Sequence, residues 1–412
     1  MRREAELSSF TICGLRLDGL STIDGRFSYY LQYSRNSVGR VFCRHSVFVF
    51  TAFIMSESFA PAQSLGRWLD VSTGKEAMVA ASRGRSFLLS TQNPDGSWSD
   101  DPAISGICIL AIVTNAVNDD SGNESVTDRA GAYIRQRALA SGAIGLESKP
   151  ERHVFSTAVA TIALLSIQNK PSLKVIRRAI GFLLHCRRAS DSPGGGGFAW
   201  PPDTIPNIFD CHWTLAALRA CQGTGIEAIP ITQQQHRVFG SALRFVERCR
   251  FQGVDGRVKT STSGGFADFP IDHLSRNDGE SSQRRSPGPT GASTCAGVKC
   301  LLYLTATGMH PGIRGGSDWL ESHFSANSNP GACAAGIYRY YYHFASMQVL
   351  LENGGQTAEF ARPRSWRKAL AGELLSRQRS RGEWTNALPA YGENDTNLCT
   401  AYAVLTLALT IK

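Results

Sequence analysis

Residues 83–98 read Arg-Gly-Arg-Ser-Phe-Leu-Leu-Ser-Thr-Gln-Asn-Pro-Asp-Gly-Ser-Trp, and this stretch decides the fold. An apolar run with helical spacing leads to a glutamine, a Pro/Gly turn and a tryptophan, and a second apolar run follows at 104–113. The same order returns near the carboxyl end, where Gln378 and Trp384 flank a glycine turn before the apolar run 398–409. A helix–turn–helix unit that recurs about every fifty residues is typical of a repeat architecture.

Six such helical hairpins follow one another along the chain. The first helix of each is amphipathic, and we expect these helices at 74–91, 126–140, 172–188, 236–250, 314–324 and 362–378. The second is apolar nearly all round, and we expect these at 104–115, 155–168, 210–222, 291–306, 337–352 and 396–411. Amphipathic helices lie at a surface, whereas helices that are apolar on every side are buried. The pattern therefore predicts an all-α fold, an α/α toroid with an inner and an outer ring.

The repeats predict a single domain over residues 55–412, with a polar loop insertion at 254–289 in the fourth hairpin. Residues 1–54 show no repeat, and we interpret them as an extension outside the core. They either precede a true start at Met55 or form a signal-like segment around the apolar run 46–55. That run is shorter than the roughly twenty residues of a membrane span, and no other segment qualifies.

The composition indicates a globular protein and bears on its compartment and on nucleic-acid binding. The chain has 412 residues, of which 42% are hydrophobic and 19% charged, as in an ordinary globular protein. Most of its eleven cysteines lie in apolar helical stretches and no Cys-x-x-Cys pair occurs, which favours a reducing compartment. We expect a cytoplasmic protein, with peripheral membrane contact or secretion as alternatives. The net charge of +9 is spread along the repeats without a basic–aromatic module, so nucleic-acid binding is not expected.

The Gln–Gly–Trp order of the first and last repeats resembles the Gln-Trp repeat of squalene and oxidosqualene cyclases. Turns such as Gly264-Gly265-Phe266 resemble those of protein prenyltransferase β-subunits. The resemblance to this terpenoid cyclase and prenyltransferase superfamily covers about residues 74–412. It implies an α/α toroid that acts on or binds an isoprenoid, either a polyprenyl chain or a diphosphate, in a central cavity.

Resemblance to class II cyclases implies an Asp-x-Asp-Asp acid that opens an inner helix and protonates an alkene or epoxide. The nearest sequence is Glu-Asn-Asp-Thr at 393–396, with Thr396 where the fourth-position aspartate would stand. Asp395 is therefore a candidate catalytic acid. The alternative is that Asp395 caps the last inner helix by accepting backbone N–H groups.

Resemblance to prenyltransferase β-subunits implies a zinc ion held by Asp, Cys and His side chains at the starts of two inner helices. Asp210, His212 and His343 occupy comparable positions and are our candidate zinc ligands or acid–base groups. An Asp-His-His set with an open fourth position fits a catalytic zinc. Neighbouring helical residues point about 100° apart, however, so a capping Asp210 with hydrogen-bonded histidines is the alternative.

Aromatic residues gather at the predicted starts of the inner helices. We expect them to line one mouth of the toroid, and the candidates for substrate binding are Trp200, Trp213, Phe266, Tyr338, Tyr341, Tyr342 and Tyr391. Such a funnel suits an isoprenoid through apolar burial and cation–π contact with a carbocation. The sequence thus predicts an isoprenoid-acting enzyme, and the alternative is an inactive scaffold that binds a lipid, peptide or protein partner.

Overall fold

The computed structural model describes residues 69–115, 121–167, 173–189, 192, 194–222, 233–251, 264–271, 288–305, 310–334, 336–353, 363–389 and 392–411. These ranges hold twelve α-helices and one short 3-10 helix, and their only β-type pairings are isolated bridges. The extension at 1–54 and most of the insertion at 254–289 lie outside the described residues. None of the described helices combines the length and apolar character of a membrane span.

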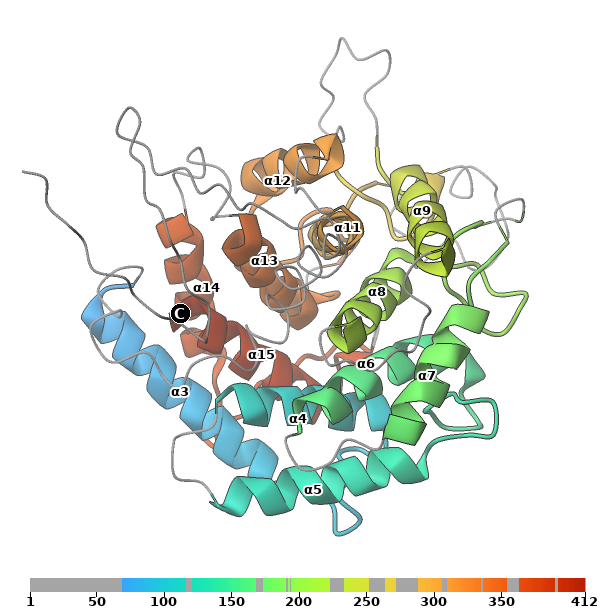
Figure 1. Cartoon of the computed structure of the whole chain (residues 1–412). Coiled ribbons are helices and arrows are strands. Elements are labelled where there is room, and N and C mark those ends of the chain that lie inside the picture. Colours follow the sequence, from blue (N-terminus) through green and yellow to red (C-terminus); the bar gives the residue numbers. More distant parts are fainter. Residues whose placement is uncertain are drawn as a thin grey trace, which may run out of the picture. The chain divides into compact units, whose positions relative to one another are not determined.

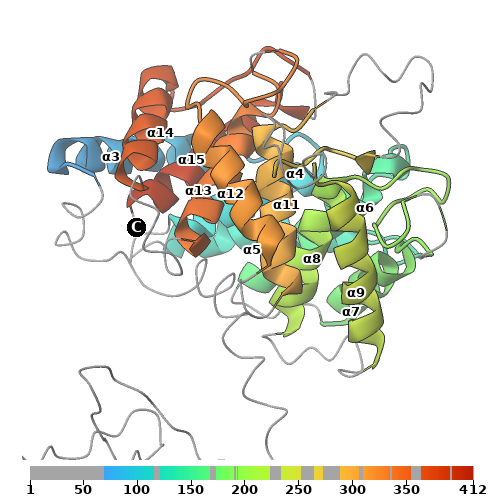
Figure 2. The same ribbon diagram turned by 90° about the horizontal axis from the view of Figure 1, so that it is seen from above.

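The helices form two concentric rings (Figure 1). The outer ring consists of α3 (Val71–Ser90), α5 (Ser121–Gln136), α7 (Leu173–His185), α9 (Gln233–Arg248), α12 (Pro311–His323) and α14 (Pro363–Arg377). The inner ring consists of α4 (Pro102–Thr114), α6 (His153–Ser166), α8 (Ile208–Gln222), α11 (Gly291–Leu304), α13 (Arg339–Asn353) and α15 (Thr396–Ile411). Each inner helix packs against the next, and α15 packs against α4, so the ring is closed. The predicted α/α toroid is confirmed, and both views show α11 between α12 and α8 (Figures 1 and 2).

Burial follows the sequence pattern. Every residue of α4 from Pro102 to Ile112 is buried, and so is every residue of α15 from Leu398 to Thr410. An outer helix such as α7 buries only one face, through Ile176, Phe182 and their neighbours. Helices without a polar face can only exist where other helices surround them, which places the core between the rings.

Both tryptophans of the repeat are fully buried and make the same hydrogen bond. Trp98 Nε1 donates to Leu88 O at 2.8 Å, and Trp384 Nε1 donates to Leu374 O at 2.8 Å. Each acceptor lies ten residues earlier, on the preceding outer helix. A buried indole N–H needs a partner, so each tryptophan holds its turn against the end of that helix.

The two glutamines link neighbouring outer helices. Gln92 Nε2 donates to Val126 O of α5 at 2.9 Å, and Gln378 Nε2 donates to Ala80 O of α3 at 2.8 Å. Each amide also donates to the carbonyl of the glycine in its own turn. Because α14 precedes Gln378 and α3 is the first outer helix, this second link helps to close the outer ring.

A glycine-to-alanine substitution in the first repeat turn should be strongly destabilising. Gly96 has φ +90°, and an added Cβ would lie 2.4 Å from Arg129 O, a backbone atom that cannot move aside. We expect Gly96→Ala to lower the free energy of unfolding by about 3 kcal/mol, measured by urea denaturation. The control is Gly372→Ala on the exposed face of α14, where a Cβ meets nothing within 4 Å and stability should rise by about 0.5–1 kcal/mol. Equal effects at the two positions would contradict this account.

Candidate functional site

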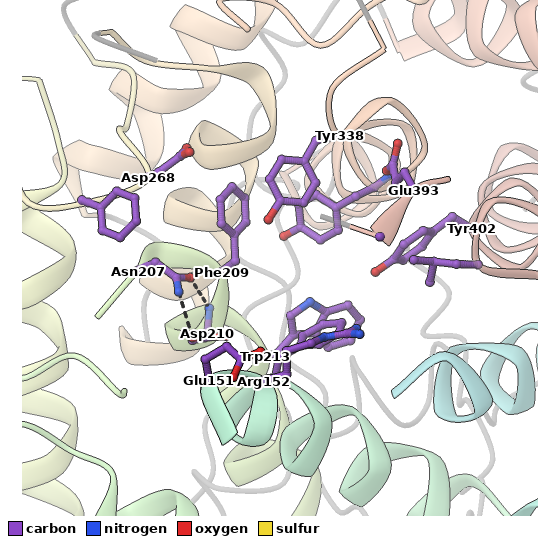
Figure 3. Close-up of a pocket in the computed structure, with 15 residues that line it drawn as sticks. Glu151, Arg152, Asn207, Phe209, Asp210, Trp213, Asp268, Tyr338, Glu393 and Tyr402 are labelled. Carbon is purple, nitrogen blue, oxygen red and sulfur yellow. Dashed lines mark hydrogen bonds between the residues drawn. The ribbon is translucent and has the colours of Figure 1, made fainter. Parts of the chain in front are cut away.

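A cavity of about 330 Å³ opens among the amino-terminal ends of the inner helices (Figure 3). Its wall comes from α6, α8, α13 and α15, from residues just before these helices, and from the described segment 264–271. The wall is rich in aromatic side chains, which include Phe155, Phe209, Trp213, Tyr338, Tyr341 and Tyr402. It also carries four carboxyl side chains, those of Glu151, Asp210, Asp268 and Glu393. The cavity therefore combines apolar faces with groups that can hold or release a proton.

Asp210 is fixed on this wall by a reciprocal pair of hydrogen bonds with Asn207 (Figure 3). Asp210 N donates to Asn207 Oδ1 at 2.8 Å, and Asn207 Nδ2 donates to Asp210 Oδ2 at 2.8 Å. Asn207 immediately precedes α8, so this is a cap of the type in which a first-turn side chain reaches back to the capping residue. The pair holds the Asp210 carboxyl at the cavity.

The carboxyl of Asp210 has a pKa close to neutral pH. Burial raises its pKa to about 7, and the hydrogen bond from Asn207 and the charge of Arg152 offset this only in part. Removing a carboxylate from water disfavours its charged form. A substantial fraction of Asp210 is therefore protonated at neutral pH, as a general acid must be.

Glu393 also lines the cavity, but its carboxylate accepts hydrogen bonds from the first turn of the neighbouring helix α13. Glu393 Oε1 accepts from Tyr341 N at 2.8 Å, and Oε2 accepts from Tyr340 N at 3.3 Å and from Asn386 Nδ2 at 3.2 Å. Burial raises its pKa to about 7 even though these donors favour the charged form. Both carboxylate oxygens thus serve the first turn of α13, and Glu393 acts as its cap.

Asp395, the predicted catalytic acid, is placed at the start of α15. Its Oδ1 accepts from Leu398 N at 2.9 Å, and its side chain is not part of the cavity wall. The structure thus gives Asp395 the alternative role of helix cap. The Glu-Asn-Asp-Thr sequence that resembled an acid motif places one carboxylate on each of two helix starts.

The two candidate histidines lie behind the wall in different places. His212 is fully buried, and its Nδ1 lies 3.1 Å from Tyr341 Oη. His343 is also fully buried, and its Nε2 donates to Ala326 O at 2.7 Å. Burial lowers the pKa of His343 to about 3 and that of His212 well below its ordinary value, so both rings are neutral.

The predicted zinc ligands do not converge. Asp210 faces the cavity, His212 is turned to Tyr341, and His343 is turned to a backbone carbonyl. In the part of the chain that the structure describes, no three His, Cys, Asp or Glu side chains are grouped so that they could hold a metal ion. The residues present therefore do not fit a zinc site, and no step of the chemistry is assigned to zinc.

Three of the predicted aromatic residues, Trp213, Tyr338 and Tyr341, line the cavity. Trp200 lies instead in a separate hollow of about 390 Å³ beside α7, with its ring 5.7 Å from that of Phe182. The turn that carries Trp200 folds back onto the outer helix, which removes it from the mouth.

Two other predicted aromatics are packing residues. Phe266 is fully buried against Gly297 of α11, where an added Cβ would lie 2.4 Å from the phenyl ring. Tyr342 is fully buried against Gly291, with a corresponding distance of 2.6 Å. Neither lines the cavity. Tyr391 lies outside the described residues.

Sequence reasoning missed several wall residues, among them Glu151, Arg152, Asp268 and Tyr402. Glu151 and Arg152 come just before α6, as Asn207 comes just before α8. A polar residue immediately before an inner helix was thus a sequence signal that could have identified these wall residues. No comparable signal in the sequence identifies Asp268.

No family model and no curated protein sequence matches the chain. Solved structures do share its fold. A variant of the type II terpene cyclase MstE from Scytonema, in complex with geranylgeranyl dihydroxybenzoate as substrate, is 13% identical and covers 82% of this chain and 99% of its own, with a TM-score of 0.53. An inactive variant of the α-1,6-mannanase GH76A of Salegentibacter sp. HEL1_6, in complex with α-1,6-mannotetrose, is 11% identical and covers 81% and 98%, with a TM-score of 0.55. At such identities the likeness shows the toroid fold alone.

Proposed function

We propose that this protein is an acid-initiated isoprenoid cyclase that binds a polyprenyl chain in the cavity of the inner ring. The observation that carries the proposal is Asp210, a carboxyl on an aromatic wall whose pKa burial raises to about 7. The fold likeness to MstE, whose complex holds a geranylgeranyl compound, adds support. Asp210 takes the acid role that the sequence had suggested for Asp395.

The chemistry uses only groups of this chain. The Asp210 carboxyl proton adds to one carbon of a terminal double bond, and the positive charge is left on the other carbon. The electron pair of a neighbouring double bond closes a ring on that carbon. The faces of Trp213, Tyr338 and Tyr341 stabilise the moving charge. Loss of a proton ends the reaction and restores the acid, so the product is an isomer of the substrate.

The test is conversion of geranylgeraniol by the full chain in deuterated buffer near pH 6.5, followed by mass spectrometry. We expect a cyclic isomer that carries one additional deuterium, because the initiating proton comes from solvent through Asp210. Asp395→Asn is the control, since Asp395 caps α15 and is not part of the wall, and its product should be the same. Failure to convert geranylgeraniol and squalene alike would refute cyclase activity, and binding without conversion would favour the scaffold hypothesis.

Glycoside hydrolysis is a second candidate. Hydrolases of this kind use two carboxyl groups on either side of a glycosidic bond, and four carboxyl groups line this cavity. The fold likeness to GH76A with its bound mannotetrose points the same way. Both oxygens of Glu393 are engaged with α13, which leaves fewer carboxylates for such a pair. Release of reducing ends from α-1,6-mannotetrose, with geranylgeraniol left unchanged, would favour this function.

A further inference from the structure

A second hollow lies beside the outer helix α7 and is separate from the cavity of the inner ring. Its volume is about 390 Å³, and none of its described wall residues belongs to that cavity. The described part of the wall consists of six residues: Ser141, Arg178, Gly181, Phe182, His185 and Trp200. Small-molecule sites have volumes of this order, whereas a protein partner contacts about twenty residues on each side. The hollow therefore has the size of a small-molecule site.

Two turns flank the hollow, and an arginine holds each of them in place. Arg178 Nη2 donates to Ala140 O at 2.7 Å, in the turn that follows α5. Arg188 Nη2 donates to Pro201 O at 3.0 Å, directly after Trp200. A wall that is already held in its final position loses little conformational entropy when a ligand binds, so these contacts favour binding.

Aromatic side chains form the apolar part of the wall. The rings of Phe182 and Trp200 meet edge to face, with their centroids 5.7 Å apart, and the ring of His185 lies 6.1 Å from that of Trp200. Phe182 is buried, but Trp200 is only half-buried, so part of its indole remains available for contact. At Gly181 an added Cβ would meet nothing within 4 Å, so the hollow reaches the backbone of α7. Such a wall suits a planar aromatic ring.

The charge of this wall is positive. Its described residues include the guanidinium of Arg178 and no carboxyl group. Within the described residues the hydrogen bonds of Arg178 use Nη2 alone, which leaves Nε and Nη1 as donors. The exposed face of α7 adds Lys174 and Arg177, and α7 contains no acidic residue. One guanidinium with two adjacent N–H donors matches a single carboxylate.

We propose that this hollow is a binding site for a small aromatic carboxylate. The ring of the ligand packs against Phe182 and Trp200, and its carboxylate accepts hydrogen bonds from Arg178. The site shares no residue with the cavity of the inner ring, so it is independent of the proposed cyclase function.

The experiment measures the binding of 2-naphthoate and of its uncharged isostere 2-naphthamide to the full chain by ligand-detected NMR titration at pH 8. We expect 2-naphthoate to bind with a Kd on the order of 0.1–1 mM, as befits a ligand of this size. The amide should bind at least about ten-fold more weakly, because it cannot form the charge-assisted pair with Arg178.

Two pairs of variants locate the ligand. Gly181→Leu fills the hollow from α7 and should weaken 2-naphthoate binding at least about ten-fold without loss of folding stability, since leucine is a better helix former than glycine. Its matched control is Gly372→Leu, at an exposed glycine of the outer helix α14 where a Cβ also meets nothing within 4 Å. Arg178→Gln should abolish the preference for the carboxylate, whereas Arg177→Gln removes the same charge from the same helix and should retain it.

Several results would overturn the proposal. They are absence of 2-naphthoate binding, equal affinity for the two compounds, unchanged binding by Gly181→Leu, and equal loss of binding in Gly181→Leu and Gly372→Leu. The comparison of the two compounds uses the unaltered chain, so it does not depend on how well a variant folds. Conversion of geranylgeraniol tests the proposed function separately, and Gly181→Leu should leave that conversion unchanged.

Discussion

Replacing Asp210 by asparagine should slow cyclisation strongly and, above pH 7, make the folded chain more stable. The amide cannot supply a proton, and loss of a general acid costs about a hundred-fold to ten-thousand-fold in rate. For the unaltered protein, the rate should fall as pH rises through about 7, because the protonated form of Asp210 is then lost. The rate of isomer formation from geranylgeraniol, followed between pH 5 and pH 9, measures both effects.

The gain in stability follows from the direction of the pKa shift. The pKa of Asp210 is about 7 in the folded state and about 3.9 in an unfolded chain. Between these values the folded state keeps a proton that the unfolded state has released, so the free energy of unfolding falls as pH rises through this window. An asparagine at position 210 does not ionise, so it removes this fall in the free energy of unfolding. It can also keep both hydrogen bonds with Asn207. We expect Asp210→Asn to raise the free energy of unfolding by about 2 kcal/mol at pH 8, since solvent at the cavity screens part of the cost.

Urea denaturation at pH 8 and at pH 4 tests this sign. At pH 4 the difference between the variant and the unaltered chain should shrink to about 0.5 kcal/mol, because Asp210 is then protonated in the folded state and about half protonated in the unfolded chain. Asp318→Asn on the exposed face of α12 is the control and should show no pH-dependent gain. A variant less stable than the unaltered chain at pH 8 would contradict the assignment of Asp210 as a buried acid.

Replacing Glu393 by glutamine should have the opposite effect on stability. Glu393 uses both oxygens to accept from the backbone N–H groups of Tyr340 and Tyr341 and from Asn386. A glutamine has one acceptor oxygen, and its NH₂ group would face one of these donors. Leaving a buried donor unsatisfied costs about 1–3 kcal/mol. The neutral glutamine also removes the burial cost that raises the pKa of Glu393 to about 7, so we expect Glu393→Gln to lose only about 1 kcal/mol of folding stability at pH 7.

Urea denaturation at pH 7 measures the loss, and amide hydrogen exchange at Tyr340 and Tyr341 shows whether the start of α13 has opened. Asp395→Ala is the comparison, because it removes an ordinary cap at the start of α15 and should cost about 1 kcal/mol. A fully stable Glu393→Gln chain that has lost activity would instead make Glu393 the catalytic acid. The two carboxyls thus share a raised pKa of about 7 but have different hydrogen-bond partners.

Much of the fold could be predicted from the sequence, because the position and burial of each helix follow from its own local pattern of apolar residues. The twelve described helices fall at the positions expected from apolar periodicity, with ends that shift by a few residues. Helices with no polar face form the inner ring, as their composition requires. The recurring glutamines and tryptophans predicted equivalent turns, and the structure gives them equivalent hydrogen bonds.

The site was predictable only in part, because it depends on which face of each inner helix points inward. Asp210 and Trp213 lie three residues apart on α8 and both line the cavity, whereas His212 between them is turned to Tyr341. Tyr338 and Tyr341 show the same spacing at the start of α13. A spacing of three or four residues identifies residues that share a face, but not the direction in which that face points.

The sequence by itself determined the helices, their division into two rings and the turns that join them, since apolar periodicity and glycine or tryptophan positions act locally. The tertiary structure alone decided that the Asp210 carboxyl lines the cavity, that Glu393 and Asp395 cap helices, and that Asp210, His212 and His343 do not meet. The physical reason is that pKa values, caps and ligand sets depend on what surrounds a side chain. In this fold those neighbours come from segments distant in sequence, which only the closing of the ring brings together.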